Sequence, residues 1–231
     1  MRAASASGSC PRATRRRHGT SFDAERLDAG ASGVRCPGMK RLVVGITGAS
    51  GSVYGIRLLE ALRRVEGIES HLVISASGKR TLAEETDYSV KDVEALAHVV
   101  YDNRDVGASL ASGSFKTMGM AIAPCSIKTV SALANSFADT LISRAGDVSL
   151  KEGRPLVAVV RETPLHAGHL KQMLALAEIG GVILPPVPAF YNRPKTLDDI
   201  VKHTVGRVLD RLGIEHSLVA EWTGGGRKAV Q

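Results

Sequence analysis

Residues 42–51 read LVVGITGASG, an apolar run that ends in a turn of small residues. A helical pattern of apolar side chains follows this turn, at Tyr54, Leu58, Leu59 and Leu62. The order predicts a buried strand, a tight turn and a helix, because glycine lets the backbone turn sharply and approach a ligand closely. The first N–H groups of a helix favour an anion, so the turn is a candidate phosphate site.

Apolar strands alternate with helical patterns from Lys40 onward. Continuous apolar strands between helices indicate a parallel sheet that is covered on both faces. The predicted fold class is therefore α/β, a three-layer α/β/α sandwich with a doubly wound, mostly parallel sheet. Strands are expected at 41–47, 70–75, 98–101, 119–124, 155–160 and 181–184, and helices at 52–65, 77–86, 90–97, 126–135, 138–150, 166–179 and 196–212.

Composition limits the classes of partner. The net charge is +7, of which residues 1–38 carry +4 and the remainder +3. An excess of this size is met by a small anionic substrate, so no nucleic acid is predicted. No apolar run approaches the roughly 18 residues that span a membrane. Cys10, Cys36 and Cys125 show neither metal-ligand spacing nor a disulfide framework, which predicts no metal and a cytoplasmic location.

Residues 1–38 are rich in Ala, Ser, Gly and Arg and have no hydrophobic periodicity. They are predicted to be a disordered tail, and residues 39–231 a single domain. Acidic residues at 23–28 and the lack of an amphipathic stripe argue against an organelle transit peptide. The simpler interpretation is that Met39 is the true start and that the upstream residues are an over-extended reading frame.

Small hydroxyl residues follow two of the predicted strands. Ser75 follows the second strand, and Ser126 and Thr129 follow the fourth. Parallel sheets bind ligands at the carboxyl ends of their strands, so these side chains are candidates to bind a phosphate. Ordinary helix capping explains the same residues equally well.

Charged and aromatic residues follow the last two strands. Arg161 and Glu162 end the fifth strand, either as a salt bridge or as a phosphate-binding cation beside a proton-handling carboxylate. A proline-rich loop after the sixth strand carries Phe190 and Tyr191, which suits a pocket wall or an interface. Cys125 is interpreted as a packing residue rather than a nucleophile, and the His166–His169 pair as capping or packing rather than a metal site.

Several motifs together resemble the UbiX-type flavin prenyltransferases, which include the small B subunits of aromatic hydroxyacid decarboxylase systems. The resemblance covers about residues 40–222. The motifs are 45–51 (GITGASG), 85–87 (ETD), 112–115 (SGSF), 123–129 (APCSIKT), 144–148 (RAGDV), 150–152 (LKE), 161–165 (RETPL) and 188–194 (PAFYNRP).

The resemblance implies a flavoprotein-type fold and a metal-independent transferase. It implies transfer of a dimethylallyl group from dimethylallyl monophosphate to reduced FMN. The product, prenylated FMN, would serve a UbiD-type aromatic acid decarboxylase. The family also implies a homo-oligomer, with a dodecamer as the expected form.

The resemblance also implies roles for residues. FMN would bind at Gly48, Ala49, Ser50, Ser75, Ser126, Ile127, Lys128, Thr129 and Arg144. The prenyl phosphate would bind at Lys151, Arg161, Tyr191 and Arg207, because cations and a phenol stabilise a departing phosphate. Glu162 would protonate the leaving group, and Ser50 and Glu85 would assist proton removal at ring closure. Each residue also fits a surface or ion-pair role, and Lys151 fits a solvated helix end.

One departure and three alternatives remain. Some relatives carry a Trp in the loop where this chain has Val106, which leaves aromatic stabilisation of a cation from that loop open. A flavin-dependent cysteine decarboxylase would need a His in the first helix, and 52–65 contains none. A non-catalytic flavin-carrier subunit of a decarboxylase fits the same sequence. A dinucleotide-dependent oxidoreductase is disfavoured, because no acidic residue ends the second strand to hold a ribose.

Overall fold

Six parallel strands form one sheet in the computed structural model, which describes residues 38–219. The strand order is β3-β2-β1-β4-β5-β6, and every neighbouring pair is parallel. The strands are β1 (Lys40–Ile46), β2 (Ile68–Ile74), β3 (Val99–Asp102), β4 (Gly119–Cys125), β5 (Leu156–Val160) and β6 (Gly181–Ile183). The predicted doubly wound α/β class is confirmed, and the sheet is parallel throughout rather than mostly parallel.

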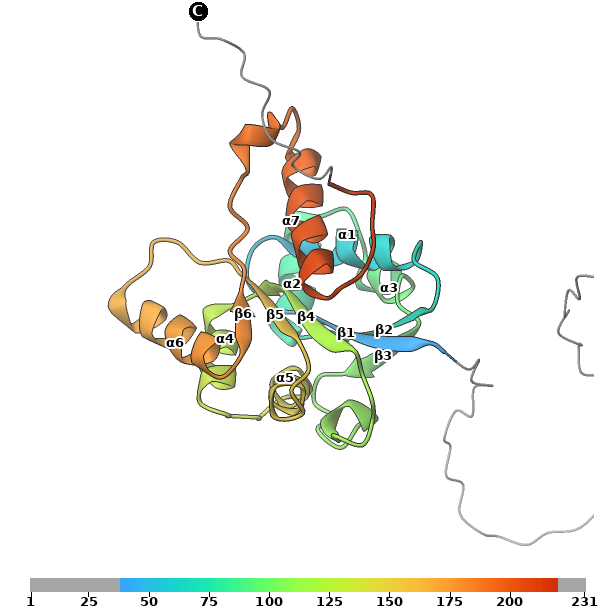
Figure 1. The fold of residues 1–231 in the computed structure, drawn as a ribbon, viewed down its shortest axis with the longest axis vertical. Coiled ribbons are helices and arrows are strands. Elements are labelled where there is room, and N and C mark those ends of the chain that lie inside the picture. The colour runs from blue at the N-terminus through green and yellow to red at the C-terminus, as the bar shows by residue number, and fades with distance from the viewer. Residues whose placement is uncertain (1–37, 220–231) are drawn as a thin grey trace, which may run out of the picture. The chain divides into compact units, whose positions relative to one another are not determined.

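Helices cover both faces of this sheet (Figure 1). They are α1 (Ser52–Leu62), α2 (Ala76–Glu85), α3 (Val90–Glu94), α4 (Ile127–Ala134), α5 (Leu141–Lys151), α6 (Ala167–Glu178) and α7 (Leu197–Arg211). On one face α1 packs beside α7, and on the other α4 packs beside α5, while α6 lies against α4 and β6. The three predicted layers are therefore present.

The chain runs outward from β1 to β3 and then returns to the centre of the sheet at β4. The strand order thus reverses between β1 and β4. In open parallel sheets the ligand crevice lies at the carboxyl ends of the strands on either side of such a reversal. The fold places the GITGASG turn and the APCSIKT segment side by side at this position.

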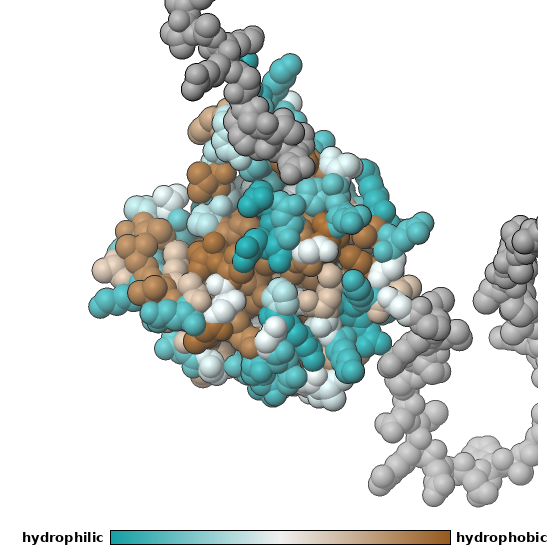
Figure 2. Space-filling model, viewed as in Figure 1, coloured by the Kyte–Doolittle hydropathy of each residue, from teal (hydrophilic) through white to brown (hydrophobic). Residues whose placement is uncertain are grey.

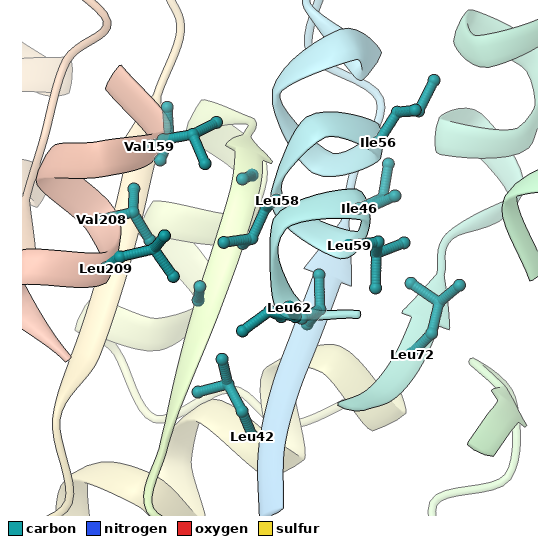
Figure 3. Packing of buried hydrophobic residues seen from close by; sticks show 14 of the residues in the cluster. Leu42, Ile46, Ile56, Leu58, Leu59, Leu62, Leu72, Val159, Val208 and Leu209 are labelled. Atoms are coloured by element: carbon teal, nitrogen blue, oxygen red, sulfur yellow. The ribbon is translucent and has the colours of Figure 1, made fainter. Parts of the chain in front are cut away.

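The helix α1 is fixed to the sheet by one apolar face. Leu58, Leu59 and Leu62 are fully buried among residues of β1 and α7 (Figure 3). Each such side chain contributes about 1.5–3 kcal/mol when it is removed from water. Gly55 lets the helix approach closely, because a Cβ at this position would lie 2.4 Å from the Ala123 carbonyl oxygen of β4. This contact fixes the start of α1 next to the end of β4.

The predicted elements all appear within the described residues, with boundaries shifted by a few positions. Two short 3₁₀ helices were not predicted, η1 (Ser109–Ala111) and η2 (Phe190–Asn192). The predicted tail lies outside the described residues except for Gly38, so the domain boundary after residue 38 stays a prediction. Among the helices of residues 38–219, none has the length and apolar character to cross a membrane.

Candidate functional site

A cavity of about 290 Å³ opens at the carboxyl edge of the sheet, among the ends of β1 to β4 and the first turns of α2, α4 and α5. Its lining residues are Thr47, Ser75, Ala76, Ser77, Asn103, Arg104, Ser126, Lys128, Thr129, Ala132, Asp139, Thr140, Ile142 and Ser143. The structure thereby brings together four residues predicted to bind FMN, namely Ser75, Ser126, Lys128 and Thr129. We call this space the switch-point cavity.

The first turns of α2 and α4 face the switch-point cavity. Ser75 caps α2 by accepting from Gly78 N at 2.9 Å, and Ser126 caps α4 by accepting from Thr129 N at 3.4 Å. The N–H groups at the first two positions of a helix have no acceptor within the helix itself. In α4 these are the N–H groups of Ile127 and Lys128. Together with the partial positive charge of both helix ends, they make the cavity suited to an anion.

The first turn of α1 is different, because a side chain of the chain already fills it. Glu85 Oε2 accepts from Gly51 N at 2.8 Å and from Ser52 N at 3.1 Å. Burial raises the pKa of Glu85, but hydrogen bonds from Ser50, Gly51 and Ser52 outweigh burial and hold the pKa below its usual value. The predicted anion site at this turn is therefore occupied by a carboxylate, which is a correction to the prediction of a phosphate there.

The first turn of α5 is also filled from within the chain. Leu141 N donates to the Asn103 backbone oxygen at 2.8 Å, and Ile142 N donates to Asn103 Oδ1 at 3.1 Å. Thr140 and Ser143 complete a capping box at the same end. Compared with α1 and α5, the helices α2 and α4 therefore keep first-turn N–H groups that no distant residue in the described part of the chain fills.

Thr47 ties the two central strands together beneath the cavity. Its side chain is 2% exposed. Its Oγ1 donates to the Pro124 carbonyl at 2.8 Å and accepts from Ser126 N at 2.8 Å. The hydroxyl therefore fixes the residue that caps α4 relative to the β1–α1 turn.

Gly48 supports the wall of the cavity rather than lining it. A Cβ at Gly48 would lie 2.5 Å from both side-chain atoms of Ser77, which is a lining residue. Neither Ala49, Ser50 nor Ile127 is among the lining residues. The structure brings Ser50 and Glu85 into hydrogen-bonding contact, so these two predicted catalytic residues form a pair.

The other predicted residues lie at two separate places, one at the end of β5 and one beside α7. Arg161 and Glu162 follow β5 directly, and Glu162 Oε1 accepts from Thr163 N at 3.2 Å. Burial raises the pKa of Tyr54 while the charge of Arg161 opposes it, which places Arg161 near α1. Tyr191 of η2 and Arg207 of α7 line a shared hollow of about 870 Å³, the α7 hollow, with residues of the segment 213–219.

Two predicted residues lie away from these positions. Arg144 donates from Nε to the Ala111 carbonyl at 3.2 Å and pairs with Asp147 at 3.2 Å, and it is not among the lining residues of the switch-point cavity. Lys151 ends α5 and lies 3.7 Å from Glu152. Since α5 begins at the cavity, its rise places Lys151 about 15 Å along the helix, toward the amino edge of the sheet.

The remaining reactive side chains take structural positions. Cys125 is fully buried, and burial raises the pKa of its thiol, which disfavours the thiolate that a nucleophile needs. His166 caps α6 by accepting from Gly168 N at 3.0 Å, and its ring lies 3.6 Å from that of His169, centroid to centroid. Within residues 38–219 there is no group of three or more His, Cys, Asp or Glu side chains placed to hold a metal ion.

Several lining residues were missed by the sequence analysis. Asn103 and Arg104 directly follow β3, so their position at a strand end was a usable signal. Asp139 and Thr140 reach the cavity from the connection between α4 and α5, and Ser143 reaches it from the first turn of α5; no strand-end rule would identify them. Tertiary packing alone brings them to the site.

Comparison with known proteins gives a matching family model, a similar relative and two similar crystal structures. A family model described as Flavoprotein matches residues 32–209. The flavin prenyltransferase UbiX of Escherichia coli strain K12 is 58% identical over 188 residues, which are 80% of this chain and 100% of that protein.

Two crystal structures are similar. AnUbiX (PadA1) in complex with FMN and dimethylallyl pyrophosphate has a TM-score of 0.79 and 45% identity, covering 81% of this chain and 100% of that one. The dodecameric FMN-dependent UbiX-like decarboxylase from Escherichia coli O157:H7 has a TM-score of 0.78 and 50% identity, covering 80% of this chain and 100% of that one.

Proposed function

Because this chain belongs to the flavoprotein family and, within it, to the UbiX-type flavin prenyltransferases, we propose that it transfers a dimethylallyl group from dimethylallyl monophosphate to reduced FMN. The product is prenylated FMN. The observation that carries the proposal is the switch-point cavity, onto which two helix N-termini with open first turns converge.

The residues of the switch-point cavity fit FMN. A phosphate group suits the first turns of α2 and α4, where Ser126 and Thr129 add hydroxyl donors and Lys128 and Arg104 add positive charge. The Glu85 carboxylate at the start of α1 disfavours a second anion there. We therefore place the FMN phosphate at α2 and α4, and the flavin ring toward the turn formed by residues 48–50.

When bound, reduced FMN supplies the electron-rich ring that accepts the dimethylallyl group. The chain's own residues have three tasks. Arg161, Tyr191 and Arg207 bind the prenyl phosphate and stabilise the charge that develops as the carbon–oxygen bond breaks. Glu162 donates a proton to the departing phosphate. Ser50 relays the proton that the ring loses at ring closure, passing its own hydroxyl proton to the Glu85 carboxylate beside it.

The position of Lys151 supports a site that more than one copy of the chain completes. Lys151 lies at the opposite edge of the sheet from Arg161. We propose that Lys151 serves the prenyl phosphate bound by another copy. Arg144 lies in the first turn of α5 but is not a lining residue of the switch-point cavity, so we propose that it also serves the flavin phosphate of another copy.

The surface of α6 supports a homo-oligomer, and a dodecamer is the proposed form. Leu170 and Leu174 are 54% and 60% exposed, and their spacing puts them on one face of the helix. Figure 2 shows hydrophobic side chains gathered on the side of the molecule where α6 lies. Apolar surface of this kind marks contacts between proteins, and a second copy of this chain is the partner we propose.

The same proposal covers the product's destination. Prenylated FMN is a cofactor rather than an end product, so a decarboxylase of the UbiD type is its proposed recipient. We place the protein in the cytoplasm, because Cys125 is a free, buried thiol.

An anaerobic assay tests the transferase. Purified protein is incubated with reduced FMN and dimethylallyl monophosphate, and the extracted flavin is analysed by mass spectrometry. The expected result is a mass gain of one dimethylallyl unit, which requires protein and is lost in Glu162→Gln. Glu84→Gln, which removes the charge of an exposed carboxylate on α2, is the matched control and keeps the product.

A parallel reaction with dimethylallyl pyrophosphate identifies the substrate phosphate. Prenylated flavin that forms with dimethylallyl pyrophosphate but not with dimethylallyl monophosphate would contradict the monophosphate assignment. Unmodified FMN from protein that binds it would contradict the transferase and favour a flavin carrier. Continued support of a partner decarboxylase by Glu162→Gln would favour the carrier as well.

A further inference from the structure

Two polar side chains outside the proposed catalytic set, Asp210 and His216, line the α7 hollow together with Arg207. Asp210 lies one turn further along α7, and its Oδ2 accepts from Arg207 Nη1 at 2.8 Å. Its other oxygen, Oδ1, lies 3.0 Å from His216 Nε2. One carboxylate therefore joins the guanidinium to the segment that follows the helix.

The tautomer of His216 follows from its second contact. Leu218 N donates to His216 Nδ1 at 3.1 Å, so Nδ1 is an acceptor. Nε2 then carries the proton and donates it to Asp210. The His216 side chain is 8% exposed, whereas those of Arg207 and Asp210 are 54% and 42% exposed. The buried member of the group thus fixes the two exposed members.

Gly206 allows this arrangement. A Cβ at Gly206 would lie 2.5 Å from Val219 Cγ2 and 3.0 Å from His216 Cε1. The missing side chain lets the segment 213–219 lie directly against α7. The close approach brings His216 within reach of Asp210.

This inference rests on the proposed function, in which the Arg207 guanidinium points toward the prenyl phosphate. An exposed arginine has many rotamers, and holding one of them lowers the entropy lost when a ligand binds. The guanidinium has five N–H donors, so the bond to Asp210 leaves others for a phosphate. We propose that Asp210 is a positioning residue that holds Arg207 toward the prenyl phosphate, and that His216 holds Asp210.

A double-mutant cycle tests the assignment in the full-length, FMN-loaded protein. The dissociation constant of dimethylallyl monophosphate is measured by calorimetry, and KM and kcat are measured for wild type, Asp210→Ala, Arg207→Ala and the double variant. Asp210→Ala is expected to weaken binding and raise KM about fivefold, as expected for loss of a partly exposed ion pair. It is also expected to lower kcat in the same direction as Arg207→Ala, because Arg207 stabilises the departing phosphate, and to leave the FMN affinity unchanged. In the Arg207→Ala background the same change is expected to add less than about twofold.

Further variants separate positioning from a structural role. Asp210→Glu keeps the carboxylate and is expected to recover part of the affinity, and His216→Phe is expected to raise KM in the same direction as Asp210→Ala. Arg80→Ala, which breaks an exposed ion pair with Glu84 on α2, is the matched control and leaves KM unchanged. The inference would be overturned if Asp210→Ala lowered the affinity for dimethylallyl monophosphate equally in wild type and in the Arg207→Ala background. It would also be overturned if Asp210→Ala bound this compound more tightly than wild type.

The outcome for wild type separates this inference from the proposed function. Wild type that binds the compound but forms no prenylated flavin would contradict the transferase, while the dissociation constants would still decide the role of Asp210. Wild type that does not bind the compound would overturn both. A full effect of Asp210→Ala beside an unaffected Arg207→Ala would overturn the positioning role alone.

Discussion

Replacing Thr47 by Val removes one hydroxyl and keeps the side-chain volume. The hydroxyl is buried and makes two hydrogen bonds of 2.8 Å, to the Pro124 carbonyl and from Ser126 N. The Pro124 oxygen keeps a second donor, because Thr47 N lies 3.2 Å from it. Ser126 N, on a half-buried residue, is left without its acceptor, and an unsatisfied N–H costs about 1–3 kcal/mol when it is kept from water. With the lost bond to Pro124, we expect the variant to be destabilised by about 2–3 kcal/mol.

Urea unfolding at one fixed protein concentration measures this effect, with Thr47→Ser as the matched control. The serine variant keeps both bonds and loses one buried methyl group, about 0.8 kcal/mol. For a domain of this size the valine variant should also melt about 5–10 °C below wild type. FMN affinity should fall in Thr47→Val and hold in Thr47→Ser, because Thr47 orients the cap of α4. Equal urea midpoints for the two variants would refute this account of the β1–β4 junction.

Three further predictions concern single positions. Glu85→Gln should lower the free energy of unfolding by about 0.5–1 kcal/mol at pH 7. Because the pKa of Glu85 is lowered in the folded state, this loss should be constant above about pH 5 and should vanish as the pH falls through that pKa. Urea unfolding at a series of pH values measures it. Cys125→Ala should keep wild-type turnover, and peptide mapping should find Cys125 alkylated only in denaturant, since burial raises its thiol pKa. Gly55→Ala should lower the free energy of unfolding by about 1–3 kcal/mol, because the new Cβ would meet the Ala123 carbonyl oxygen. Gly107→Ala is the control: its Cβ would have its nearest neighbour at 3.5 Å, so this variant should melt like wild type.

The sequence predicted the fold well because its strands are short, apolar and separated by helical patterns. LVVGITGASG placed β1, the turn and α1, and the absence of alternation in the strands indicated a sheet covered on both faces. Ser75 and Ser126 were found because N-cap residues directly after a buried strand point to the carboxyl edge. These signals are local, so they can be recognised in the sequence without knowledge of tertiary contacts.

The errors share a different cause, which is distance along the chain. Glu85 fills the first turn of α1 from 34 positions away, and no local pattern reveals that contact. Asn103 caps α5 across 39 positions. Lys151 was assigned to the phosphate site through a motif, and that assignment stays a prediction, because the direction of α5 puts Lys151 and Arg161 of one copy at different edges of the sheet. Motif spacing identifies residue types, but only packing assigns them to one site.

A crystal structure of the protein with FMN tests the central claim most directly, because the claim assigns the flavin phosphate to particular N–H groups. We expect phosphate oxygens within about 3 Å of the Ile127 or Lys128 N–H at the start of α4, with Glu85 still bonded to Gly51 and Ser52. A phosphate bound to Gly51 and Ser52, with Glu85 displaced, would contradict it.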